Sequence, residues 1–197
     1  MEIVDTCDFG TYPRRFHAYR WYKPLLVGLL FVTFMIIIQS VINSLTELLF
    51  STTVSWSKYD DLDFFTLAGA FCNGARGASA IPSLIFAALI VRDRPISSYF
   101  SSMGGWRWKV FLKTLPAALI LVGMPIIIFH LSEGKVGDVK LTAGSVLLLT
   151  VLLPFQAAAE EMAYRGFIMQ TFSSWFKRTA VGVIVQLLIF AAVHPYN

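Results

Sequence analysis

Long uncharged apolar stretches dominate the pattern of hydrophobic and polar positions in this 197-residue chain. Leu, Ile, Phe and Val fill these stretches without alternating with polar residues. A helix of about 20 apolar residues crosses the roughly 30 Å hydrocarbon layer of a bilayer, and a single spanning segment must be helical to satisfy its backbone. The pattern therefore predicts an all-α, polytopic transmembrane bundle with about five membrane helices, at residues 24–46, 64–91, 114–132, 141–176 and 179–197.

The composition agrees with a membrane protein: 56% of the residues are hydrophobic and 14% are charged, against about 25% charged in soluble proteins. The first segment, from Pro24 to Thr46, exceeds the roughly 7–15 residues of a signal-peptide core, so we expect it to remain as an anchor. The chain contains no internal repeat and no low-complexity linker. We therefore expect residues 1–197 to form one membrane domain, with a motif-bearing core at 141–197.

Lysine and arginine outside the apolar segments are distributed unevenly between the loops. Eleven lie before the first segment, after the second or after the fourth, and only three lie on the opposite side, namely Lys58, Lys135 and Lys140. The positive-inside rule then places the N-terminus in the cytoplasm. Because the basic residues flank apolar segments and form no stripe on a polar helix, we expect no nucleic-acid partner. The expected partner is the lipid bilayer, and the expected location is a bacterial cell membrane.

Ionisable residues interrupt the fourth apolar segment at Glu160-Glu161-Met162-Ala163-Tyr164-Arg165. Charged side chains in hydrocarbon cost a few kcal/mol each, so such a cluster indicates a reaction centre. Glu161 and Arg165 are four residues apart on a helix, in the order that favours an ion pair. Glu160 lies about 140° around the helix from Arg165, at about 100° per residue. Glu160 is then left free to act as a general base.

A lone histidine, His194, lies in the next apolar segment. The two helices are expected to turn at Lys177-Arg178, and position 177 is midway between Glu160 and His194. In a symmetric hairpin these two residues lie at the same depth. We therefore predict that Glu160 and His194 face each other across a gap that holds one water molecule.

Structural explanations compete with this interpretation for each residue taken alone. Glu161 and Arg165 also fit a purely structural ion pair, and His194 fits a histidine satisfied at the membrane interface. Glu160 is harder to explain in this way, because an unpaired buried carboxylate brings no structural benefit. Taken together, the spacing of these residues favours a functional site.

The two motifs resemble those of the CAAX protease and bacteriocin-processing family, known as CPBP or Abi. Residues 160–165 fit its EExxxR motif, and Phe190-Ala191-Ala192-Val193-His194 fits its FxxxH motif, in the family's order and on consecutive apolar segments. Residues 102–108 also look like the family's cytoplasmic segment, although this signal is weaker. The resemblance covers mainly residues 141–197.

This resemblance implies an intramembrane endopeptidase that acts on membrane-associated or CAAX-like protein and peptide substrates, without a cofactor. Glu160 would activate a water molecule, His194 would help to hold it, and Glu161 and Arg165 would support the site. The family's third motif, a histidine followed four residues later by asparagine or aspartate, is absent before the chain ends at Asn197. We therefore expect either a fragment of a longer protein or a degenerate member.

Two functions of other classes stay open. With one further histidine, Glu160 and His194 would make a three-ligand zinc site of a metal-dependent membrane protease. A non-catalytic membrane protein, such as a bacteriocin-immunity factor or a scaffold, is the other alternative. A further polar residue, Arg76, lies in a small-residue stretch that predicts a close helix contact. For Arg76 we consider pairing with Glu47 or Glu161, snorkelling to the surface, or contact with substrate.

Overall fold

The computed structural model describes residues 9–54, 66–101, 108–118 and 142–194, with a few single positions between them. Within these ranges the regular structure is entirely helical, so the predicted all-α class is confirmed. The longer elements are α1 (Lys23–Phe50), α2 (Leu67–Ala78), α3 (Ala80–Val91), α4 (Trp108–Ala118), α6 (Ala143–Glu161), the π-helix η4 (Met162–Met169), α7 (Gln170–Phe176) and α8 (Thr179–Val193). Short 3₁₀ turns, η1 (Tyr12–Arg15) and η2 (Ile96–Tyr99), precede α1 and follow α3.

Three helical stretches of the described chain are long and apolar enough to cross a membrane: Lys23–Phe50, Leu67–Val91 and Ala143–Phe176. They coincide with the first, second and fourth segments predicted from the sequence. The fifth segment forms a shorter apolar helix, Thr179–Val193. The third, 114–132, lies largely outside the described residues, and only α4 overlaps its beginning.

The helix ends follow local sequence signals. Thr142 caps α6 in a reciprocal arrangement, because its side chain accepts a hydrogen bond from the Ser145 amide while the Ser145 hydroxyl accepts one from the Thr142 amide. Thr66 caps α2 with a single hydrogen bond, which its hydroxyl accepts from the Gly69 amide. Such caps satisfy amide groups that have no partner in the first turn. The loop residue Lys177 takes a left-handed conformation with φ 56°, which ends α7 and turns the chain into α8.

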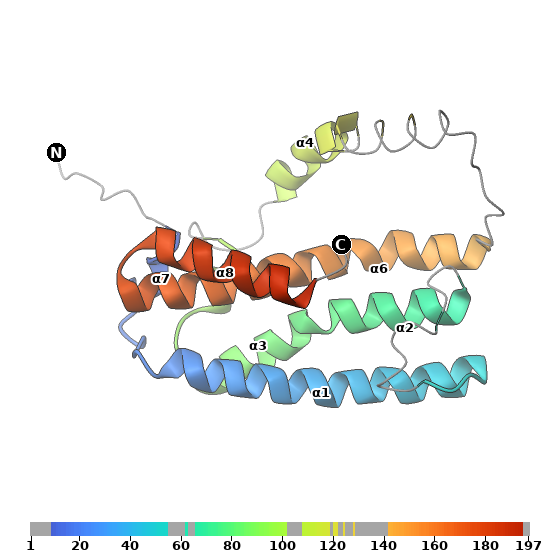
Figure 1. The fold of residues 1–197 in the computed structure, drawn as a ribbon, viewed down its shortest axis with the longest axis horizontal. Coiled ribbons are helices and arrows are strands. Elements are labelled where there is room, and N and C mark those ends of the chain that lie inside the picture. The colour runs from blue at the N-terminus through green and yellow to red at the C-terminus, as the bar shows by residue number, and fades with distance from the viewer. Residues whose placement is uncertain are drawn as a thin grey trace.

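The long helices lie side by side, as Figure 1 shows. α1 runs one way, while the α2–α3 and α6–α7 stretches run the other, and α3 packs on α1 as α2 packs on α6. At one end, Arg14 donates to the Ser174 carbonyl at 3.2 Å, and Lys23 donates to the Arg92 carbonyl at 3.2 Å. The basic N-terminal segment, the end of α3 and the end of α7 therefore meet at one end of the bundle, as the predicted topology requires.

Apolar side chains cover the outside of this bundle. On α1, Leu29 is 67% exposed and Leu48 is 77% exposed, and on α6 Leu147 is 67% exposed. Among the described residues, one cluster of buried apolar side chains consists of Val27, Leu84, Ala87, Ala88, Tyr99 and Met162. An outward-facing apolar surface of this extent is a surface for lipid contact.

The predicted close contact of the small-residue stretch is present between α2 and α6. A methyl group added at Gly74 would come within 2.8 Å of the Leu152 side chain, and one added at Gly77 would come within 2.6 Å of Gln156. Glycines let the two backbones approach closely, which is how helices associate in lipid. Arg76 is buried at this contact with 3% of its surface exposed, so the snorkelling alternative was wrong. Its pairing with a carboxylate stays a prediction.

Candidate active site

The acidic cluster lies where the helix changes its geometry. α6 ends at Glu161, residues Met162–Met169 form a π-helix, and α7 resumes at Gln170. The prediction treated the whole segment as an α-helix with 100° per residue, which is wrong for residues 162–169. π-Helical turns are rare and occur frequently at functional sites. This segment separates Glu160 and Glu161 from the part of the helix that leads into the hairpin.

Glu161 and Arg165 form the predicted ion pair, with Arg165 Nε 3.2 Å from Glu161 Oε2. Their side chains are 59% and 62% exposed, respectively. The described helices therefore do not bury this pair. It lies on the surface of the helix, where further side chains or a substrate have access to it.

Glu160 is half-buried and has a polar neighbour that the sequence argument did not include. Gln156, one turn earlier on α6, donates to Glu160 Oε1 at 3.4 Å, which is a long and weak hydrogen bond. Gln156 in turn packs against Gly77 of α2. Within the described part of the chain Glu160 has no cationic partner, so its carboxylate keeps acceptor capacity for a further donor.

His194 ends α8, and the contacts of its imidazole determine which ring nitrogen is protonated. Its Nδ1 atom lies 3.0 Å from the Phe190 carbonyl oxygen. Because a carbonyl oxygen can only accept, Nδ1 carries the hydrogen in this contact. The other nitrogen, Nε2, has no hydrogen-bond partner among the described residues. It is the atom that this histidine offers to a water molecule or a substrate.

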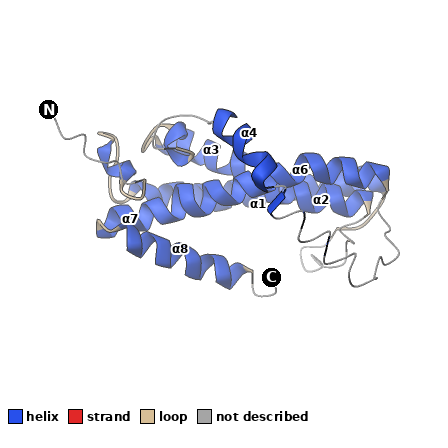
Figure 2. Cartoon of the chain, turned by 90° about the horizontal axis from the view of Figure 1, so that it is seen from above, coloured by secondary structure: helices blue, strands red, loops and turns tan. Residues whose placement is uncertain are grey.

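The predicted hairpin and its register are confirmed by ring contacts between the two motifs. Tyr164 contacts Phe190 with ring centroids 5.0 Å apart, and positions 164 and 190 are centred on 177. The His194 ring stacks on Phe190 at 4.2 Å and lies 6.4 Å from the Tyr164 ring. Figure 2 shows α7 and α8 joined at one end of the bundle. His194 therefore lies beside the residue one turn after Glu160.

Glu160 and His194 themselves are not joined by a direct hydrogen bond or ion pair in the described structure. The ring contacts between the two motifs are made by Tyr164 of the first motif with Phe190 and His194 of the second. A single water molecule bridging the carboxylate and Nε2 of the imidazole stays a prediction.

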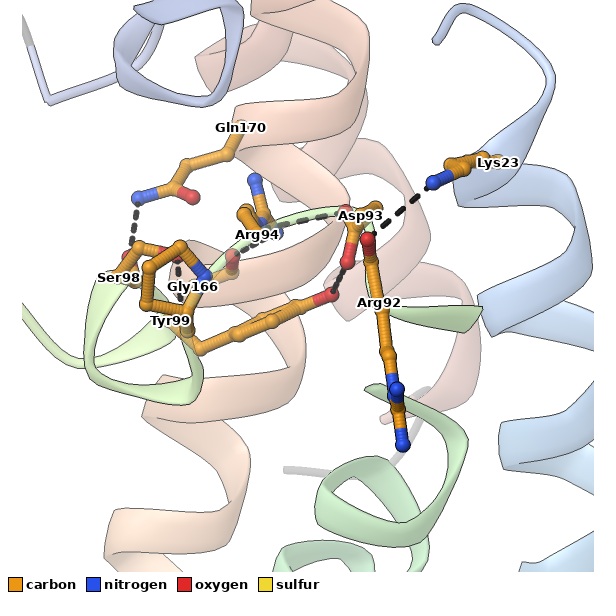
Figure 3. Close-up of polar contacts among 9 residues, drawn as sticks. Lys23, Arg92, Asp93, Arg94, Ser98, Tyr99, Gly166 and Gln170 are labelled. Carbon is orange, nitrogen blue, oxygen red and sulfur yellow. Dashed lines mark hydrogen bonds and ion pairs between the residues drawn. The ribbon is translucent and has the colours of Figure 1, made fainter. Parts of the chain in front are cut away.

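A second group of polar residues lies against the π-helix and was not recognised from the sequence. We call Asp93, Arg94, Ser98, Tyr99 and Gln170 the buried polar cluster, because each is at most 6% exposed. Figure 3 shows them between η2 and the helix that carries Gly166. Tyr99 donates its hydroxyl hydrogen to Asp93 at 2.9 Å, and burial raises the pKa of Tyr99 above its usual range, which keeps the phenol protonated.

From the sequence, Arg94 was interpreted only as one of the basic loop residues that determine the membrane topology. Two features of the sequence were consistent with buried polar contacts in this region. Asp93-Arg94 places an acid and a base together directly before Pro95, and Gln170 is a neutral polar residue within an apolar helix. Neither feature identifies a partner, because the contacts join residues 72 positions apart.

The described residues include single side chains that could bind a metal, such as Glu160 and His194, but no complete metal site. They contain no grouping of three or more His, Cys, Asp or Glu side chains that would hold an ion. A zinc site at Glu160 and His194 would need ligands from outside the described ranges. The weaker motif at residues 102–108 and the chain end at Asn197 also lie outside them, except for the backbone of Trp108.

The structure thus defines a helical protein with apolar helices long enough to cross a membrane, in which two acids end α6 and a histidine ends α8. α8 packs on the π-helix that continues from α6. Residues 142–197 match the family model described as Type II CAAX prenyl endopeptidase Rce1-like, consistent with a protein of the CPBP family. The resemblance based on the two motifs is confirmed for this part of the chain. Neither the curated proteins nor the solved structures compared with the chain gave a match.

Proposed function

We propose that this protein is an intramembrane endopeptidase in which Glu160 activates a water molecule for attack on a peptide bond. The observation that carries the proposal is the register of the hairpin, which puts His194 beside Tyr164, one turn from Glu160. The family match over residues 142–197 supports the same chemistry. The substrates are membrane-associated or CAAX-like proteins or peptides.

In this mechanism the Glu160 carboxylate takes a proton from water, and the resulting hydroxide attacks the carbonyl carbon of the scissile peptide. His194 Nε2 orients the water, because its Nδ1 hydrogen is already donated to the Phe190 carbonyl. The tetrahedral intermediate then collapses, and the proton held by Glu160 passes to the leaving amine. One water is consumed, and a carboxylic acid and an amine are produced.

Glu161 and Arg165 take a supporting role in this proposal. Their ion pair satisfies both charges locally, at 3.2 Å, and within the described ranges Glu160 is left without a cationic partner. The exposed Arg165 guanidinium is also positioned to meet the carbonyl groups of a bound peptide, since guanidinium groups are strong donors to oxygen.

The test is cleavage of membrane-anchored fluorogenic peptides by the full-length protein in lipid vesicles. Glu160→Gln should lower the rate by at least about 100-fold, the lower end of what general-base catalysis contributes. The variant should unfold at the wild-type temperature, because glutamine keeps the size of the side chain. Glu47→Gln is the matched control, since Glu47 accepts a hydrogen bond from the Val54 amide and lies in α1.

The two alternative functions predict other outcomes in the same assay. A wild-type rate that is lost with a chelator and restored by zinc would favour the metal-dependent protease. Full biological activity of Glu160→Ala, without any cleavage by wild type, would favour an immunity factor or a scaffold. A wild-type rate in Glu160→Gln would refute the proposed role of Glu160.

We also propose that the basic end of the bundle faces the cytoplasm. The contacts that join the N-terminal segment, the end of α3 and the end of α7 support one shared basic end. A cysteine at the exposed Lys177 should be protected from an impermeant thiol reagent in intact cells, whereas one at Ser57, which lies outside the described residues, should react. The opposite labelling pattern would reverse the orientation.

A further inference from the structure

The loop after α3 is hydrogen-bonded to the π-helix and to the first residue of α7, as Figure 3 shows. Arg94 donates through Nη2 to the Gly166 carbonyl at 3.0 Å, and Gln170 donates its side-chain amide to the Ser98 carbonyl at 3.1 Å. Positions 166 and 170 are about one turn apart along the helix. Two bonds at this spacing restrict both rotation and sliding of the helix relative to the loop.

The Gly166 carbonyl accepts the Arg94 hydrogen bond at the point where the helix changes geometry. In a regular α-helix the Gln170 amide would donate to Gly166, four residues earlier. Here the Gln170 amide donates to the Phe167 carbonyl, three residues earlier. The Arg94 guanidinium supplies a hydrogen bond to the carbonyl that has lost its α-helical donor.

Arg94 is itself held in place by its neighbours in the buried polar cluster. Its Nε atom lies 3.5 Å from Asp93 Oδ2, an ionic contact without hydrogen-bond geometry. Its guanidinium carbon lies 3.9 Å above the centre of the Tyr99 ring, which is cation–π contact distance. Because Asp93, Arg94 and Tyr99 are 1%, 6% and 1% exposed, the described helices keep them away from substrate.

The π-helix determines how Glu160 is oriented relative to His194. α8 is packed on the helix beyond Glu160, because a methyl group at Gly182 would overlap the Met169 carbonyl and the Ser173 hydroxyl. Glu160 lies on the other side of the π-helical turns. A π-helical turn contains about one residue more than an α-helical turn. If residues 162–169 became α-helical, α6 would therefore rotate relative to α8 by about 100°, the angle of one residue. The carboxylate would then turn away from His194.

We propose that Arg94 is a positioning residue for the protease reaction: it keeps residues 162–169 in the π-helical form and thereby directs Glu160 toward His194. Asp93 and Tyr99 hold its guanidinium in place for this role. The inference rests on the proposed function, because it assigns Arg94 a part in that reaction.

The experiment compares Arg94→Met with Arg92→Met in the full-length protein. Arg92 is the matched control, since its exposed side chain donates to the carbonyl of Leu89 in its own helix. Arg94→Met should lower kcat by about 100-fold, the loss that a misplacement of about 1 Å produces, and leave KM within about twofold. Backbone amides at 162–171 should exchange with deuterium faster in Arg94→Met, and Arg92→Met should match wild type in all three measurements.

A conservative substitution separates positioning from a general packing role. Arg94→Lys keeps a donor for Gly166 but loses the planar guanidinium that also contacts Asp93 and Tyr99. It should recover part of kcat and part of the amide protection. Wild-type kcat in Arg94→Met, a loss confined to KM, or unchanged exchange at 162–171 would overturn the proposal.

A milder variant covers the case in which Arg94→Met does not fold. Tyr99→Phe removes only the hydrogen bond to Asp93 and keeps the aromatic ring, so it should lower kcat and protection by a smaller factor. Wild-type kcat and exchange in Tyr99→Phe would also overturn the proposal. If wild type cleaves no peptide, the proposed function fails, while the exchange comparison still decides whether Arg94 holds the π-helix.

Discussion

The buried polar cluster and the acid–histidine face, formed by Glu160, Glu161, Arg165 and His194, both adjoin the π-helix but differ in how exposed their charges are. In the cluster, Asp93 and Arg94 are almost inaccessible, and each is engaged by neighbours within the protein. On the acid–histidine face, Glu161 and Arg165 are more than half exposed. Charges of the first kind hold two segments together, whereas charges of the second kind stay available to a substrate.

Gly166 marks the boundary between these two regions. It directly follows Arg165 of the acidic motif, and its backbone touches the Tyr99 carbonyl so closely that a methyl group would overlap that oxygen. The same residue accepts the hydrogen bond of Arg94. The buried polar cluster can therefore approach the π-helix this closely only because residue 166 is glycine.

The largest stability effect is expected from the buried side of this comparison. Asp93→Asn should lower the free energy of unfolding by about 3–5 kcal/mol, because it leaves the buried Arg94 without its anionic partner. Thermal unfolding in detergent measures this loss. A melting temperature close to that of wild type would mean that Arg94 finds its compensation elsewhere.

Gly166→Ala tests the boundary itself. The added methyl group meets a backbone oxygen, which cannot rotate away, so we expect a loss of about 1–3 kcal/mol and a lower melting temperature. Gly28→Ala is the control, since a methyl group there would lie 3.4 Å from the tip of the Phe167 ring. Equal melting temperatures for the two variants would show that the loop and the π-helix separate easily.

A smaller effect is expected on the exposed side. Glu161→Gln should cost at most about 1 kcal/mol, because ion pairs of exposed side chains contribute little. Its melting temperature should therefore fall less than that of Asp93→Asn. A loss equal to that of Asp93→Asn would show that other parts of the protein bury the Glu161–Arg165 pair.

The smallest effect concerns the ionisation of Tyr99, which is invisible at neutral pH. Burial raises the pKa of Tyr99 above the ordinary value of about 10, so its stabilising contribution is complete below that pH and is lost as pH rises through the higher folded-state value. The ultraviolet difference titration between wild type and Tyr99→Phe should show no tyrosinate signal near pH 10. A signal at that pH would place Tyr99 in contact with solvent.

Much of the fold followed from the apolar segments. Three of the five predicted membrane helices are present as spanning helices, and the fifth is present as the shorter α8. The hairpin centred on 177 was also correct, since Tyr164 meets Phe190 across it. These features depend on the length of the apolar segments and on the residues at the turn, and both can be read from the sequence. The ion pair of Glu161 with Arg165 was predictable for the same reason, because both residues belong to one helix.

The parts that sequence reasoning missed depend on contacts between distant segments. The π-helix at 162–169 carries no distinctive residue pattern of its own, and the donor to Gly166 comes from Arg94, 72 positions earlier. The hydrogen bond from Gln156 to Glu160 is different, because the two residues are four apart in α6 and the spacing alone could have indicated it. The roles of Glu160, His194, Glu161 and Arg165 in a reaction stay predictions that the cleavage assay addresses.

The sequence by itself determined that this chain enters a bilayer and carries its acids and its histidine on neighbouring helices. Hydrophobic length and charge placement act locally or over one helix, so they can be recognised without coordinates. The tertiary structure alone decided which charges are buried and which are exposed, and where the helix departs from the α-helical form. Those outcomes depend on how closely α3, the π-helix and α8 approach one another, and such distances arise only when the segments pack together.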